Sequence, residues 1–114
     1  MRQALSRWAS PNDQHDRDLR RTYALAGVQS IAEAPDRDRV VLRGSLRTVT
    51  LRPRGGVPAL EAELYDGSGA IVLVWLGRRR IAGITPGRAV QVEGRIGTAD
   101  GHRVLYNPRY ELIP

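Results

Sequence analysis

Hydrophobic and polar residues alternate in the C-terminal two thirds of the chain, with the period of two that is typical of β-strands. Such alternation places one face of a strand against a core and the other toward solvent. The segment Ala70–Leu76 is apolar throughout, which indicates that both of its faces are at least partly covered. The pattern predicts five strands, at 40–46, 60–64, 70–76, 90–96 and 104–106, the last resuming at 110–113 after Asn107-Pro108.

Two of the predicted strands share the pattern apolar-x-apolar-x-Gly-x-apolar, with Gly44 and Gly94 at the glycine position. A glycine inside a strand marks a bend, a bulge or the close approach of another backbone. In the first strand the alternation changes phase at Arg47-Thr48 and then continues to Leu51. Such a slip indicates a β-bulge, so we expect this strand to bend and to pair in two halves.

Turn signals separate the strands. Asp66-Gly67-Ser68-Gly69 is the strongest hairpin signal in the chain, and Asp100-Gly101 is a second tight turn. Residues 52–58 are rich in Pro and Gly and predict a loop. The connection 77–87, between the third and fourth strands, is longer and predicts a loop or a short helix.

The residues before the first strand lack this alternation. Residues 1–17 are polar and predict a flexible segment, and residues 18–37 predict a short helical segment. Within it we expect a helix over 18–26 and a helical or irregular piece over 28–34. All five strands therefore fall in a domain that spans residues 38–114.

The number and order of these elements are typical of one fold. Five strands in about 75 residues, an interior glycine in the first and a longer connection between the third and fourth describe an OB-fold. We therefore predict a mainly β protein, a five-stranded Greek-key OB-fold barrel with a short N-terminal helical segment.

Length and composition limit the class of protein. A chain of 114 residues allows one domain. It has no cysteine, which excludes disulfides, thiolate catalysis and cysteine-ligated zinc or iron–sulfur sites. No apolar run is long enough for a transmembrane helix, and the first residues lack the apolar stretch of a signal peptide. We expect a cytoplasmic protein that can associate with the nucleoid.

The charge is basic and unevenly placed. All 18 basic residues are Arg, a bias that a GC-rich genome produces and that also suits phosphate binding and base stacking. Residues 1–38 are neutral in sum, so the net charge of +6 lies entirely in residues 39–114. The strand ends carry two groups of arginines, at 39–54 and 78–95. The excess favours a polyanionic partner.

Residues 38–113 resemble nucleic-acid-binding OB-fold modules of the type found in anticodon-binding domains and in the wedge domain of branch-migration helicases. As a whole, the chain looks like the small stand-alone OB-fold proteins of actinobacteria. The resemblance implies nucleic-acid binding and a role in DNA repair, recombination or replication. The residues that carry it are Val40-x-Leu42-x-Gly44-x-Leu46, Leu64-Tyr65-Asp66-Gly67-Ser68-Gly69, Val74-Trp75-Leu76-Gly77-Arg78-Arg79-Arg80-Ile81, Pro86-Gly87-Arg88, Val90-x-Val92-x-Gly94 and Tyr106-Asn107-Pro108-Arg109-Tyr110-Glu111-Leu112.

In proteins of this type the binding surface is the outer face of the second and third strands with the loops around it. Counting by alternation, Tyr65 is the best candidate for stacking on a base, while Trp75 belongs to the core. Glu61 and Glu63 share the face with Tyr65, and two carboxylates there repel phosphate. The third strand contributes Val72, Val74 and Leu76 to the same face.

The arginines of the loops and of the first strand form a predicted rim that follows a phosphate backbone. We expect single-stranded DNA or RNA, bound with low sequence specificity. The candidate nucleic-acid-binding residues are Arg43, Arg47, Arg52, Arg54, Tyr65, Arg78, Arg79, Arg80 and Arg103.

No catalytic motif is present. The chain has no HExxH helix, no phosphate-binding P-loop and no GxSxG elbow, and its histidines are His15 and a turn residue, His102. We therefore expect no enzyme, no cofactor and no metal site. The alternative to nucleic-acid binding is a protein-interaction module or a homo-oligomer that docks through an exposed strip of Val72, Val74 and Leu76.

Overall fold

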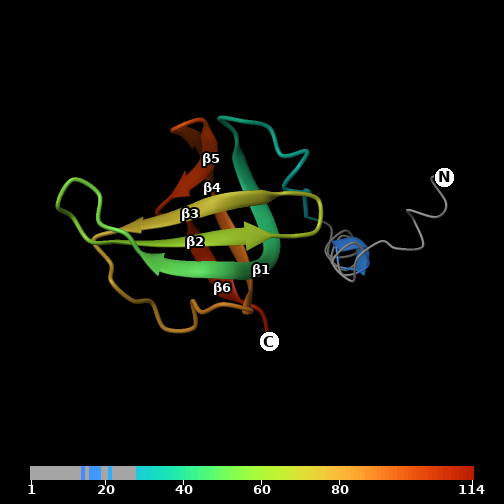
Figure 1. The fold of residues 1–114 in the computed structure, drawn as a ribbon. Coiled ribbons are helices and arrows are strands. Elements are labelled where there is room, and N and C mark those ends of the chain that lie inside the picture. Colours follow the sequence, from blue (N-terminus) through green and yellow to red (C-terminus); the bar gives the residue numbers. More distant parts are fainter. Residues whose placement is uncertain (1–13, 15, 19–20, 22–27) are drawn as a thin grey trace, which may run out of the picture.

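The computed structural model describes residues 14, 16–18, 21 and 28–114. The strands curl into a barrel, with β2 and β3 crossing its near side (Figure 1). No helix among the described residues is long and apolar enough to cross a membrane. The strands are β1 (Arg39–Leu51), β2 (Ala59–Tyr65), β3 (Ala70–Leu76), β4 (Ala89–Ala99), β5 (His102–Tyr106) and β6 (Arg109–Leu112).

The strand pairings confirm the predicted fold. The order is β1-β2-β3-β5-β4, and β1 also pairs with β4, which closes the barrel. The β3–β5 pairing is parallel and the others are antiparallel. The final strand β6 begins after the break at Asn107-Pro108, as the sequence predicts, and the structure pairs it with β4. The protein is therefore an OB-fold barrel.

The first strand bends as predicted. Its first half pairs with β4 and its second half with β2. Leu46 lies opposite Leu64 and Val49 opposite Ala62, so two residues of β1 face the single residue Glu63. This bulge changes the phase of the alternation, and both Leu46 and Val49 therefore pack on the core.

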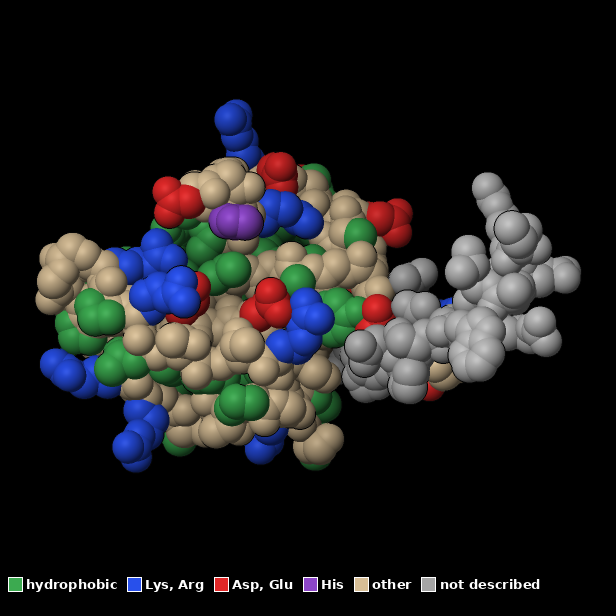
Figure 2. Space-filling view, in the orientation of Figure 1, with side chains coloured by type: hydrophobic (Ala, Val, Ile, Leu, Met, Phe, Trp, Pro, Cys, Tyr) green, Lys and Arg blue, Asp and Glu red, His purple; other side chains and the backbone are tan. Residues whose placement is uncertain are grey.

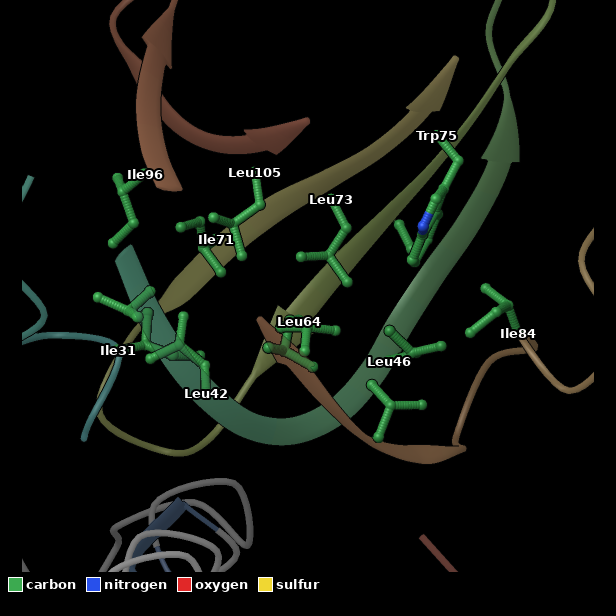
Figure 3. Packing of buried hydrophobic residues seen from close by; sticks show 14 of the residues in the cluster. Ile31, Leu42, Leu46, Leu64, Ile71, Leu73, Trp75, Ile84, Ile96 and Leu105 are labelled. Atoms are coloured by element: carbon green, nitrogen blue, oxygen red, sulfur yellow. The ribbon is translucent and has the colours of Figure 1, made fainter. Parts of the chain in front are cut away.

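The barrel interior is filled by the inward-facing residues of all five strands, and other segments close its ends. Figure 3 shows Ile31 beside Leu42 at one end and Ile84 beside Leu46 and Trp75 at the other. The connection that carries Ile84, residues 77–88, is irregular rather than helical. Trp75 belongs to the core, as expected, and its Nε1 donates a hydrogen bond to the carbonyl of Pro108 at 3.0 Å.

Hydrogen bonds hold residues 28–34, which precede β1, against one end of the barrel. Residues 28–34 form an irregular piece with one turn. The buried carboxylate of Asp66 accepts hydrogen bonds from the backbone N–H groups of Ile31, Ser68 and Gly69. Residues 14, 16–18 and 21 are helical. The flexible segment predicted over 1–17 and the helix predicted over 18–26 lie largely outside the described residues and stay predictions.

Candidate nucleic-acid interface

The outer face of β2, β3 and β5 carries an apolar layer at its centre. The layer consists of Ala59, Val74 and Val104, with Val72 and Ala99 packed against it. Val74 is 0% exposed and Val72 is partly buried, which confirms that both faces of β3 are at least partly covered. It corrects the alternative of an exposed strip of Val72, Val74 and Leu76, of which Leu76 is exposed, at 42%. The cause is the parallel neighbour β5, which sets Val104 beside Val72 and Tyr106 beside Val74.

Arginines neutralise the two acidic residues of this face. The Glu61 side chain is only 17% exposed and lies 3.0 Å from Arg54 Nη2 and 3.8 Å from Arg52 Nη1. Arg47 Nε donates a hydrogen bond to Glu63 Oε1 at 2.7 Å, across the bulge of β1. The exposed Arg47–Glu63 pair contributes about 0–1 kcal/mol, so a ligand can displace it at low cost.

An arginine also lies over each of two tyrosines on this side. The guanidinium carbon of Arg47 is 3.8 Å from the ring centroid of Tyr65, and that of Arg54 is 5.9 Å from the ring centroid of Tyr106. Tyr106 is 43% exposed and was missing from the predicted site. The alternation along β5 could have identified Tyr106, because Leu105 points inward and its neighbour Tyr106 therefore points outward.

A hollow of about 120 Å³ lies between the β1–β2 loop and the β4–β5 turn. Figure 2 looks onto this side and shows arginine side chains next to acidic and hydrophobic ones. Sequence reasoning placed Arg52, Arg54, Glu61 and Val72 on this side but did not predict the hollow, which forms where loops from distant parts of the chain meet. Its lining residues are Arg52, Arg54, Glu61, Val72, Ala99, Asp100, His102 and Val104.

The arginine triplet Arg78-Arg79-Arg80 follows β3 after Gly77 and is exposed to solvent. The N–H of Gly77 donates a hydrogen bond to the carbonyl of Pro58 at 2.7 Å, so the triplet starts beside the β1–β2 loop. Within the described part of the chain, none of its three guanidinium groups forms an ion pair. These three positive charges are therefore available to a ligand.

Two of the predicted site residues lie elsewhere. Arg43 donates from Nε to the side chain of Gln91 at 2.6 Å, on the seam between β1 and β4. Arg103 was expected in a loop, but the tight turn at 100–101 places it within β5. There it donates to the carboxylate of Asp36 and to the carbonyls of Ile31 and Ala34, so it fastens the segment before β1.

The comparisons with known proteins support the fold. No family model matches this chain, and neither does any curated protein. Among solved structures, the chain is similar to a chain of a replication protein A heterotrimer bound to single-stranded DNA. The TM-score is 0.53 and the identity 13%, over 79% of this chain and 75% of that one. At this identity the likeness shows the OB-fold alone.

Proposed function

We propose that the protein is a non-catalytic binder of single-stranded nucleic acid, with the strand lying across the outer face of β2, β3 and β5. The observation that carries this proposal is the exposed triplet Arg78-Arg79-Arg80, which forms no ion pair with any described residue. It lies at the edge of a face that bears Tyr65 and Tyr106. An OB-fold commonly binds oligonucleotides with this face and the loops beside it. The likeness to a protein bound to single-stranded DNA makes that ligand the first to test.

The charges on the face favour one orientation of the strand. Glu63 and Glu61 cancel the charges of Arg47 and Arg54, so the surface over β2 has little net attraction for phosphates, whereas the triplet attracts them at the rim. Bases therefore face the sheet, where stacking on a tyrosine contributes about 1–3 kcal/mol per base. A duplex hides its bases and presents phosphates, so we expect it to bind more weakly.

The arrangement sets the expected salt dependence. Four arginines that neutralise phosphates on a single strand produce a slope of log K against log salt of roughly −3. The contacts to phosphates and ring faces carry little sequence information, which supports low sequence specificity. We propose that this binding serves DNA repair, recombination or replication in the cytoplasm of an actinobacterium.

The experiment is fluorescence anisotropy with labelled single-stranded DNA, single-stranded RNA and duplex DNA of about 20 nucleotides, enough for one OB-fold site, across a salt series. We expect single strands to bind with the slope above. Replacement of all three triplet arginines by Glu abolishes this binding. Arg79→Glu weakens it more than Arg109→Glu, which makes the same charge change on β6. Absence of binding at low salt and tens of micromolar protein, or a triplet variant with unchanged affinity, overturns the proposal.

A protein-interaction module or a homo-oligomer is the second candidate. The observation that favours it is the exposure of Leu51, Val57 and Leu76, at 47%, 46% and 42%. Size-exclusion chromatography with light scattering tests the oligomer. A mass that stays at 12.6 kDa over a wide concentration range contradicts it.

A further inference from the structure

The hollow beside the β1–β2 loop has an apolar floor. Val72, Val104 and Ala99 form this floor, and they belong to the apolar layer outside the barrel core. An apolar cavity of roughly 150 Å³ accommodates a benzene molecule. The hollow measures about 120 Å³, which suits one six-membered ring that also projects out of the opening.

The walls of the hollow carry both acceptors and donors of hydrogen bonds. Glu61 and Asp100 supply carboxylate oxygens, and Arg52, Arg54 and His102 supply N–H groups. The two carboxylates balance the two guanidinium groups, so the hollow has no excess positive charge to attract a phosphate. A nucleobase fits better, because it has apolar ring faces and an edge that combines donors with acceptors.

Two features of Arg54 and Glu61 point to an incoming polar ligand. Arg54 holds the Glu61 carboxylate through Nη2, so the position of its acceptor oxygens is set before a ligand arrives. The Glu61 side chain is 17% exposed and lines the hollow, so its carboxylate can still accept a hydrogen bond from a group that enters there.

We propose that this hollow binds one pyrimidine base of the strand and prefers cytosine to thymine; the inference rests on the proposed function. Cytosine carries an amino group at N4 that donates to a carboxylate such as Glu61. Thymine presents the oxygen O4 at the same place, where it faces the carboxylate without a proton between them. The protein therefore reads one base in an otherwise sequence-tolerant strand.

The test compares the affinity of the protein for two labelled oligonucleotides, oligo-dT and the same strand with one central dC. Both are about 12 nucleotides long, which is within the range of site sizes of OB-folds. A hydrogen bond to a charged group corresponds to roughly a tenfold change in affinity, so we expect wild-type protein to bind the dC strand about tenfold more tightly. Glu61→Gln removes this preference. The amide NH₂ of glutamine donates to O4 of thymine as readily as the amide oxygen accepts from cytosine.

Glu63→Gln is the matched control. It removes the same charge from the same face of β2, but Glu63 pairs with Arg47 and does not line the hollow. We expect this variant to keep the cytosine preference. Val72→Phe fills the hollow with a ring, so we expect it to bind both strands with equal affinity. Unfolding curves confirm that each variant is folded.

The outcomes separate the two proposals. Equal affinity of wild-type protein for the two strands overturns the base preference and leaves the proposed function standing. If Glu63→Gln loses the preference for cytosine as Glu61→Gln does, the hollow is not the site that recognises the base. Failure of wild-type protein to bind any single strand overturns the proposed function and the base pocket together.

Discussion

Alanine substitution of two glycines that occupy the same place in the same sequence pattern should change stability in opposite directions. A Cβ at Gly44 would lie 2.7 Å from the carbonyl oxygen of Tyr65 and 3.0 Å from Leu64 Cγ. The Tyr65 carbonyl belongs to the paired strand β2 and cannot move without separating β1 from β2. At Gly94 the nearest atom would be a methyl carbon of Leu105 at 3.5 Å, an ordinary van der Waals contact.

The magnitudes follow from two opposing terms. Replacing glycine by alanine at a compatible position stabilises a protein by about 0.4–1 kcal/mol, because the unfolded chain loses conformational freedom. Overpacking of a rigid site costs about 1–3 kcal/mol. Gly44→Ala should therefore destabilise the protein by about 1–2 kcal/mol, and Gly94→Ala should stabilise it by about 0.5 kcal/mol.

Thermal and urea unfolding followed by circular dichroism measure both variants. For a domain of this size, 1 kcal/mol shifts the Tm by roughly 4–8 °C. We expect the Tm of Gly44→Ala to fall by about 4–16 °C and that of Gly94→Ala to rise by about 2–4 °C, with unchanged m-values. If both variants shift the Tm in the same direction, the assignment of Gly44 to a close backbone approach is wrong.

Three further predictions concern single side chains. Asp66→Asn places an NH₂ group opposite the backbone N–H of Ile31 and should lower the free energy of unfolding by about 2 kcal/mol. Asp100→Asn, in an exposed turn, should change it by no more than about 0.5 kcal/mol, and equal effects of the two substitutions in urea titrations would contradict the anchoring role of Asp66. Trp75→Phe removes the donor to the Pro108 carbonyl and should cost about 1–2 kcal/mol in the same assay, and a neutral result would mean that the bond contributes nothing. Tyr106→Ala should weaken single-strand binding by about 5- to 150-fold in anisotropy titrations with little change in Tm, and unchanged affinity would remove Tyr106 from the interface.

The elements of the barrel were predictable because their signals are local. The change of phase at Arg47-Thr48 is a property of consecutive residues, and it correctly predicted the bulge in β1. The break at Asn107-Pro108 likewise predicted where β5 ends and β6 begins. Alternation also placed Trp75 in the core, because neighbouring side chains of a strand point to opposite faces.

The candidate site was predicted only in part, because its contacts join residues from different strands. Tyr65, the loop arginines and the triplet Arg78-Arg79-Arg80 lie at or beside the face that their strand positions indicated. The neutralisation of Glu61 by Arg54 depends on how the β1–β2 loop folds back over β2. The apolar run of β3 indicated that both of its faces are covered, but the parallel neighbour β5, which buries Val74, follows from a pairing that no local pattern contains.

The sequence by itself determined the strands, their inward faces, the tight turns and an excess of positive charge on the barrel domain, since each follows from nearest-neighbour patterning and composition. Only the tertiary structure decided which arginines are free. Arg103 has the same side chain as Arg79, yet it is committed to the carbonyls of Ile31 and Ala34, about 70 positions away in the chain. The physical reason is that a guanidinium donates hydrogen bonds to any carbonyl or carboxylate within reach. Which carbonyls and carboxylates lie within reach of a given arginine depends on how the whole chain is folded.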